Sequence, residues 1–244
     1  CDPPGGPASC AAYVDLPGVF LGARHVAAGG ARLAHGMGAT LRDVFVTGFN
    51  AVGVRLDGGH EVMLQDCWLA EYYWDEAHGG APTRSVGVQI NGNDHLLDNV
   101  IVFDYAHVGV QVNGAANVLT TVHTWNGGGV GIEVNAYQTR LVDCYLDYNL
   151  LRIAAPSETV VEDTFFLFTA AVLAARADGA MADVVFRHNT FYGPPANGSV
   201  ALAGAFNRSA VKNVVVADDA SGATVATRLT RTIKAPANAT GGYP

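Results

Sequence analysis

One short phrase, repeated at nearly constant spacing, limits what this chain can fold into more than any other feature. A glycine between two β-branched residues occurs at 52–54, 86–88, 108–110 and 130–132, and the last three copies are 22 residues apart. A unit of this length cannot bury its own apolar side, so successive units must stack on one another. The repeat therefore predicts a solenoid in which the glycines of successive coils align: Gly53, Gly87, Gly109 and Gly131.

A second recurring pattern predicts how the coils align. Four segments begin with an aliphatic residue and carry Asp or Thr at the third position: 64–69, 96–101, 118–123 and 141–146. Aligned in this way, Cys67 and Cys144 hold one position three rungs apart, with Asn99 and Thr121 between them. Three rungs span roughly 14 Å, whereas a disulfide needs Cα atoms within about 7 Å. Cys67 and Cys144 are therefore predicted to be free, buried thiols.

Short parallel strands separated by bends, at about twenty residues per coil, define a parallel β-helix. We expect a single-domain, all-β, right-handed solenoid of about eight coils, because parallel crossovers are almost always right-handed. Leucine-rich repeats have this period, but their Leu/Asn consensus is absent, and a propeller needs about twice the period. The predicted divisions are an irregular lead-in or cap (1–20), the β-helix (21–216) and a polar C-terminal end (217–244). Segment 170–177 has high helix propensity, yet its place in the repeat predicts a strand.

Composition narrows the classes of partner. Only 15% of residues are charged, the formal net charge is −8, and Lys212 and Lys234 are the two lysines of the sequence. Such a chain is a poor candidate for binding nucleic acid or an anionic membrane, and a polyanionic sugar would require a local arginine patch or a bound cation. The sequence has no uninterrupted run of 18 apolar residues, so no membrane-spanning helix is predicted. No motif predicts a cofactor or a metal site.

The N-terminal segment contains two cysteines, and the last quarter of the chain contains glycosylation sequons. Cys1 and Cys10 flank a Pro/Gly-rich loop and are predicted to close it with a disulfide. Three sequons in the last quarter, at Asn197, Asn207 and Asn238, predict a secreted glycoprotein of the extracellular space or cell wall.

The stretch 59–168 resembles the plant QUARTET-type polygalacturonase-like proteins of the pectin-lyase-like superfamily. The matching segments are 59–61, 91–94, 116–119, 122–123, 129–132, 144–148 and 165–167. The resemblance implies a secreted β-helix that hydrolyses pectin. The usual catalytic motifs depart from that pattern: the paired Asp-Asp occurs only at 218–219, Gly-His-Gly reads Gly-His-Glu at 59–61, and Arg-Ile-Lys reads Thr-Ile-Lys at 232–234.

The largest insertion, 70–85, directs the search for a site. Insertions in solenoids form loops on one face, often the binding face, and this one places acids beside aromatic residues. Glycosidic hydrolysis uses two carboxyl groups about 5 to 9.5 Å apart. We therefore expect Glu71 or Asp75 to act as the acid with Asp104 as its partner, and Asp147 to hold the sugar one or two rungs further on. The predicted substrate-binding residues are Trp68, Tyr72, Trp74, His123 and Trp125.

Each of these assignments has a structural alternative. The insertion could be a hydrophobic flap over the coil, and Asp104 could cap a turn. The alignment places His123 in an inward column with Leu69, Ile101 and Leu146, where a histidine is more often a core residue. An outward polar column could be a sugar groove or a solvated sheet face; it comprises Arg55, Gln89, Gln111 and Glu133. His60 and Glu61 alone are too few for a metal site.

Two classes of function remain open. The first is a secreted enzyme acting on a cell-wall or extracellular polysaccharide. The second is a non-catalytic structural or adhesive β-helix, whose ends neighbouring chains could cap. Release of reducing sugar from a polysaccharide panel separates the two.

Overall fold

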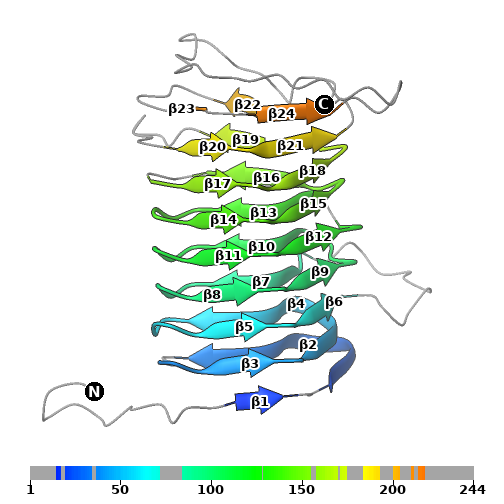
Figure 1. The fold of residues 1–244 in the computed structure, drawn as a ribbon. Coiled ribbons are helices and arrows are strands. Elements are labelled where there is room, and N and C mark those ends of the chain that lie inside the picture. Colours follow the sequence, from blue (N-terminus) through cyan, green and yellow to red (C-terminus); the bar gives the residue numbers. More distant parts are fainter. Residues whose placement is uncertain are drawn as a thin grey trace, which may run out of the picture.

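The computed structural model describes residues 15–17, 20–34, 37–71, 84–127, 129–154, 158–169, 171–174, 184–192, 200–203, 210–211 and 214–217. Within these residues the secondary structure is entirely β, and every paired strand runs parallel to its neighbour, as Figure 1 shows. The fold is the predicted single-domain β-solenoid. Among the described residues, none forms a helix that is long and apolar enough to cross a lipid bilayer.

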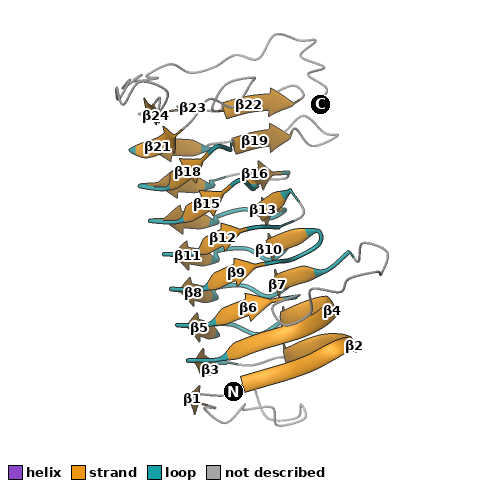
Figure 2. Ribbon diagram, turned by 90° about the vertical axis from the view of Figure 1, so that its right-hand side faces the viewer, coloured by secondary structure: helices purple, strands orange, loops and turns teal. Residues whose placement is uncertain are grey.

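Three ladders of parallel strands form the sides of the solenoid (Figure 2). Sheet 1 contains β1 (Asp15–Pro17), β3 (Thr40–Arg42), β5 (Met63–Gln65), β8 (Leu96–Asp98), β11 (Val118–Thr120), β14 (Arg140–Val142), β17 (Val160–Glu162), β20 (Val185–Arg187) and β23 (Ala210–Val211). Sheet 2 contains β6 (Trp68–Ala70), β9 (Ile101–Phe103), β12 (His123–Trp125), β15 (Tyr145–Asp147), β18 (Phe165–Leu167), β21 (Asn189–Tyr192) and β24 (Val214–Ala217). Sheet 3 contains β7 (Val86–Ile90), β10 (Val108–Val112), β13 (Val130–Val134), β16 (Leu150–Ile153), β19 (Ala171–Ala174) and β22 (Val200–Ala203).

Two long strands begin the stack. β2 (Phe20–Ala34) pairs with β4 (Phe45–Asp57), and β4 rounds a corner so that it pairs with both β6 and β7. Six successive described turns then have three separate strands each. β1 already pairs with β3, so the solenoid begins within the segment that was expected to be a lead-in. Within the segment 170–177, where a strand was predicted in place of a helix, the described residues 171–174 form strand β19.

The repeated glycines align as predicted. The flanking valines pair from coil to coil, for example Val86 with Val108 and Val108 with Val130. A Cβ on Gly87 would lie 2.6 Å from the carbonyl oxygen of Gly109, and one on Gly109 would lie 2.6 Å from that of Gly131. Close approach of consecutive backbones therefore requires glycine. The column ends at Gly131, where the pairing of β13 with β16 shifts register.

The second predicted alignment is wrong by one residue in two coils. Leu64 pairs with Leu97 and not with Leu96, and Leu97 pairs with Leu119 and not with Val118. The resulting inward column, fully buried, is Cys67, Val100, Val122 and Cys144. Asn99 and Thr121 instead lie exposed at a corner of the solenoid.

The two cysteines are free and buried, as predicted. Burial raises the pKa of the Cys144 thiol to about 12, even though hydrogen bonds with backbone groups work against the shift. This thiol therefore remains protonated at neutral pH and fills space in the core as a small apolar group.

The corners of the solenoid depend on residues in the left-handed region. Between sheets 1 and 2 each turn has one such residue with φ between 51° and 56°: Asp43, Asp66, Asn99, Thr121, Asp143, Asp163 and His188. Asp and Asn tolerate this conformation better than other residues that have a side chain. Between sheets 2 and 3 the same geometry occurs at Asp104 and Asn126, but also at Tyr148 and Phe168, whose bulky side chains do not favour it.

Candidate functional site

The insertion contributes less to the described structure than expected. Tyr72, Trp74 and Asp75 lie outside the described residues. Glu71 is only 1% exposed; its carboxylate accepts hydrogen bonds from the Ser85 hydroxyl and, at 2.8 Å, from the backbone N–H of Ala106. It therefore ties consecutive coils together at the base of the insertion, where a substrate does not reach it. Its catalytic role remains a prediction without geometric support.

Asp104 lies at the corner that follows β9. Its backbone has φ 49°, and its carboxylate accepts a hydrogen bond from the Asn126 amide one rung along. In register it lies one rung from Glu71, because Ala70 pairs with Phe103. The two carboxylates lie in different environments, because Glu71 is buried against Ala106 while Asp104 remains partly exposed.

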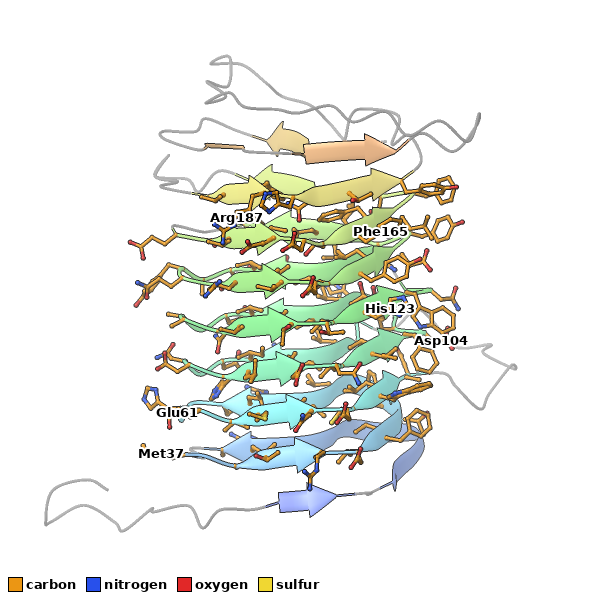
Figure 3. All side chains as sticks on the ribbon, in the orientation of Figure 1. Met37, Glu61, Asp104, His123, Phe165 and Arg187 are labelled. Atoms are coloured by element: carbon orange, nitrogen blue, oxygen red, sulfur yellow. The ribbon has the colours of Figure 1, made fainter. Side chains whose placement is uncertain are left out.

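The outward side of sheet 2 gathers aromatic side chains, and we call it the aromatic face. It consists of Trp68, Phe103, His123, Trp125, Tyr145, Asp147, Phe165, Leu167 and Tyr192, together with Tyr148 and Phe168 at the adjoining corner. In Figure 3 these rings line the side of the stack on which His123, Asp104 and Phe165 are labelled. Three predicted site residues meet here: Trp125 pairs with Asp147, while His123 pairs with Tyr145 beside them.

His123 therefore points outward and not into the core as expected. The inward column of sheet 2 is Leu69, Val102, Thr124 and Leu146. The one-residue slip in alignment had exchanged the two sides of the strand, as a shift by one residue always does. Asp147 also points outward, with Trp125 and Leu167 as its partners in the neighbouring rungs.

The rings contact one another in a continuous path around Asp147. His123 stacks on Tyr145 with centroids 4.4 Å apart, and Tyr145 meets Phe165 edge to face at 5.3 Å. The path continues through Phe165–Tyr192, Phe168–Tyr192 and Tyr148–Phe168, at 6.2, 5.8 and 5.3 Å. Asp147 lies inside this path, two residues after Tyr145 and directly before Tyr148.

A second ring stack ends beside Asp147. The rings of Phe103 and Trp125 are parallel within 4° and 4.9 Å apart. The next residue in that column is Asp147, which has no ring. Among the described residues, the face of Trp125 that looks toward the Asp147 rung is therefore not stacked on another aromatic group.

The polar groups at this position are not satisfied by the described protein. Oδ1 of Asp147 and Nε2 of His123 are buried without a hydrogen-bond partner among the described residues, although both side chains remain partly exposed. Burial raises the pKa of Asp147, and His123 works against that shift. Burial lowers the pKa of His123, and Asp147 works against it. His123 is therefore neutral at neutral pH.

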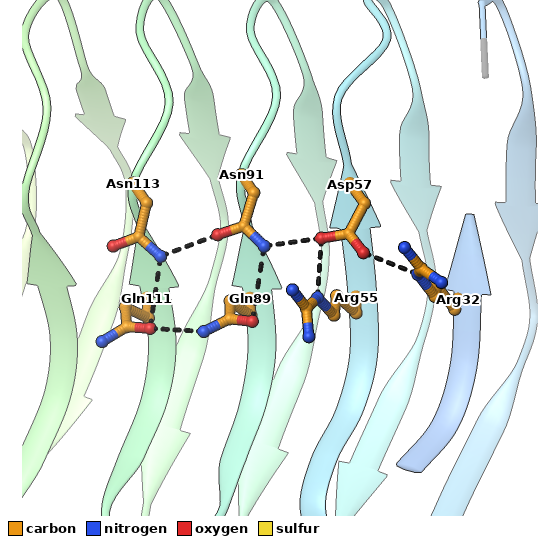
Figure 4. A network of polar contacts seen from close by, with 7 residues as sticks. All are labelled: Arg32, Arg55, Asp57, Gln89, Asn91, Gln111 and Asn113. Atoms are coloured by element: carbon orange, nitrogen blue, oxygen red, sulfur yellow. Dashed lines mark hydrogen bonds and ion pairs between the residues drawn. The ribbon is translucent and has the colours of Figure 1, made fainter. Parts of the chain in front are cut away.

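The outward polar column of sheet 3 has the opposite character (Figure 4). Asn135 donates to Asn113, Asn113 to Asn91, and Asn91 to Asp57, at 2.6 to 2.9 Å. In the neighbouring column Gln89 donates to Gln111, and Gln111 to Glu133, at 2.8 Å each. We call these two columns the amide ladder. Each of these amides donates to its neighbour, while Gln89 and Gln111 each keep a second N–H. The choice between a sugar groove and a solvated sheet face stays a prediction.

Arginines close the amide ladder at both ends. Arg32 and Arg55 each contact Asp57 at 2.6 Å, and Arg152 contacts Glu133 at 3.3 Å. Burial works to raise the pKa of Asp57, but hydrogen bonds from Asn91, Arg55 and Arg32 outweigh it and hold the pKa at about 2.

Sequence reasoning missed one cluster with metal-ligand chemistry. Ligand atoms of Glu162, Asp163 and His188 lie within 4.8 Å of one another at the corner between sheets 1 and 2. Arg187 already forms an ion pair with Glu162. The signal in the sequence was the corner column itself, in which Asp163 and His188 occupy one position of consecutive coils.

The remaining predicted residues lie outside the described residues. They are the cysteines expected to form a disulfide, Cys1 and Cys10, and the three expected glycosylation sites, Asn197, Asn207 and Asn238.

Comparison with known proteins adds little to this geometry. No protein-family model matches the chain, and no curated protein matches it. Among solved structures, a GH136 lacto-N-biosidase from Eubacterium ramulus matches with a TM-score of 0.32 and 10% sequence identity, over 77% of this chain and 51% of that one. The chain thus spans about half the length of that structure. A likeness this distant says nothing about chemistry.

Proposed function

We propose that the protein is a secreted carbohydrate-active solenoid that contacts a glycan along the aromatic face, with Asp147 as its acid group. The observation that carries the proposal is the position of Asp147. Its carboxyl group lies next to the unstacked face of Trp125, within a ring of aromatic side chains, and burial raises its pKa. Aromatic rings provide flat apolar surfaces for sugar rings, and a raised pKa suits a carboxyl group to donate a proton.

The finer proposal is polygalacturonase-like hydrolysis with two carboxyl groups. Asp104 directly follows Phe103, which lies two rungs from Asp147 in the ladder. Two rungs span about 10 Å, close to the upper limit of roughly 9.5 Å for inverting glycosidases. In this scheme Asp147 protonates the glycosidic oxygen, while Asp104 activates a water molecule on the other side of the sugar.

The test is release of reducing sugar from a panel of extracellular polysaccharides. Asp147→Asn and Asp104→Asn should each lower turnover by about two orders of magnitude or more, the effect expected from loss of an acid or base group. Asp143→Asn is the matched control, because Asp143 occupies the same left-handed conformation at an exposed corner. Its activity and melting temperature should not change. Unchanged turnover in Asp147→Asn, or no release from any polysaccharide, would overturn the catalytic assignment.

One observation favours a second candidate, a non-catalytic structural or adhesive module. Where rings stack from rung to rung, as His123 does on Tyr145, they turn their edges and not their faces outward. Such stacks stabilise a solenoid whether or not a ligand binds. Glycan binding without turnover, equal in Asp104→Asn and the unmodified protein, would support this module.

A further inference from the structure

Positive charge is distributed unevenly over the three sheets. Sheet 1 carries Arg42, Arg140 and Arg187, and the outer side of sheet 3 carries Arg55 and Arg152. In the described part of sheet 2, from β6 to β24, no strand contains Lys or Arg.

Negative charge, in contrast, borders sheet 2 on both edges. One corner column carries four aspartates in left-handed conformation, of which Asp43 lies 3.8 Å from Arg42 and Asp163 lies 3.7 Å from His188, and the opposite corner carries Asp104. Asp147 lies on the sheet between them. The four aspartates of the first corner are Asp43, Asp66, Asp143 and Asp163.

We infer that the glycan bound by the aromatic face carries positive charge, as a polymer of amino sugars with free ammonium groups does. This inference rests on the proposed function and names its substrate class. It departs from the pectin substrate implied by the resemblance, because the carboxylates of a polyuronate would meet Asp147 without an arginine to balance them, and like charges in contact are repelled.

The residues around Asp147 suit an ammonium group in two ways. When ionised, the Asp147 carboxylate is partly shielded from water, where attraction to a cation is stronger than in bulk solvent; in this binding role it is a counter-ion and not a proton donor. Trp125 precedes Asp147 in the same column, and the face that it turns toward the Asp147 rung can attract a cation through the quadrupole of the ring. Oδ1 of Asp147 has no hydrogen-bond partner among the described residues, and a sugar ammonium group would donate a hydrogen bond to it. The net charge of −8 would also draw a polycation toward the protein.

The experiment compares three soluble oligosaccharides of equal length by titration calorimetry: β-linked glucosamine, the same chain fully N-acetylated, and galacturonic acid. The glucosamine oligomer should bind about tenfold or more tightly than the acetylated one. This advantage should shrink when salt is raised from about 50 to 500 mM. The galacturonate oligomer should bind most weakly.

Two variants locate the effect. Asp147→Asn should remove most of the preference for the glucosamine oligomer, so that its affinity falls to about that of the acetylated oligomer measured with the same variant. Glu61→Gln removes the same charge from an exposed corner that Figure 3 shows on the opposite side of the stack, and it should leave the preference intact. Equal losses in the two variants would mean attraction by net charge alone and would overturn the inference.

The remaining outcomes separate this inference from the proposed function. Equal affinity for the charged and acetylated oligomers, or tighter binding of galacturonate, would refute the cationic substrate while leaving a glycan-binding face. No binding of any oligomer at millimolar concentration would refute both.

Discussion

The amide ladder and the aromatic face lie on adjacent sides of one solenoid, yet they treat polar groups in opposite ways. On sheet 3 each amide donates to the next rung, and the chains end on Asp57 and Glu133, which arginines neutralise. On sheet 2 Asp147 has no arginine, and one of its oxygens is buried without a partner among the described residues. Both faces are built on the same repeat, so the fold itself does not impose the difference.

In a repetitive structure, a binding site is best sought where the ladder of side chains is interrupted. A solenoid offers the same backbone position many times, and side chains at that position can satisfy one another from rung to rung. A face that does so has less hydrogen-bonding capacity left for a ligand. The face that interrupts its own ladder, as sheet 2 does at Asp147, keeps such capacity.

The largest effect on stability is expected when a buried residue and an outward residue of the same strand, β10, are each substituted. Val110 is fully buried, while its neighbour Gln111 faces outward on β10. Val110→Asp should lower the free energy of unfolding by about 4 kcal/mol or more, because it buries a charge without a partner. Gln111→Glu should cost only about 1 to 2 kcal/mol, through loss of one donor beside Glu133. Urea unfolding measures both, and equal costs would contradict nearest-neighbour stabilisation by the core.

A second test breaks the amide ladder itself. Asn91→Asp removes the donor to Asp57 and places two carboxylates side by side, so we expect a loss of about 2 to 3 kcal/mol in unfolding free energy. Asn93→Asp is the matched control, because the Asn93 side chain only accepts a hydrogen bond, from the Ala115 N–H at 2.7 Å. The control should be neutral within about 0.5 kcal/mol. A ladder that contributes nothing would show equal midpoints for both variants.

The acid stability of the amide ladder gives a smaller effect. The pKa of Asp57 is about 2 in the folded protein, below the value near 3.9 expected for an unfolded chain. Its ionised form therefore stabilises the fold above about pH 4, and this contribution disappears as the pH falls from about 4 to 2. Because arginines at the surface take part, we expect about 1 to 2 kcal/mol. Over that interval the unmodified protein should lose this much more stability than Asp57→Asn in urea unfolding.

The smallest effect is expected at the corner of the aromatic face. Tyr148 is 66% exposed and has φ 60°, where Asn is the more favourable residue. Tyr148→Asn should change the free energy of unfolding by less than about 1 kcal/mol, since relief of backbone strain offsets the lost stacking on Phe168. Glycan binding should nevertheless weaken measurably. A large loss of stability would show that the aromatic corner is structural.

The repeat and its glycines were predictable because they carry two independent signals. The valines fix the pairing of sheet 3, and the missing side chains at Gly87 and Gly109 reflect backbone contact between rungs. The alignment of sheets 1 and 2 failed because Leu96-Leu97 and Val118-Leu119 each offer two adjacent aliphatic residues. In a strand of three residues, the pattern of apolar side chains is compatible with both registers, so the pattern alone does not fix the pairing.

For the candidate site on the aromatic face, the sequence indicated several of the residues but not how their side chains are oriented. His123, Trp125 and Asp147 were chosen from the sequence, yet the one-residue slip turned His123 inward. The column of left-handed corner residues, rich in Asp and Asn, would have corrected the register had it been used as the anchor. The burial of Glu71 depends on Ser85 and on the backbone of Ala106, which are 14 and 35 residues away. Contacts between residues so far apart produce no recognisable pattern in the neighbouring sequence, so the burial of Glu71 could not be predicted.

The two columns of the amide ladder also determine how this molecule can lengthen. The asparagine chain donates toward Asp57, and the glutamine chain donates in the opposite direction, toward Glu133. A duplicated coil with Gln-x-Asn on its outer side therefore fits anywhere between these two carboxylates, since it accepts on one side what it donates on the other. The same coil added after Glu133 would have to share the Glu133 carboxylate with Gln111 and Arg152, which already contact it. Coils can therefore be added between Asp57 and Glu133, whereas the two carboxylates mark the ends of the amide ladder.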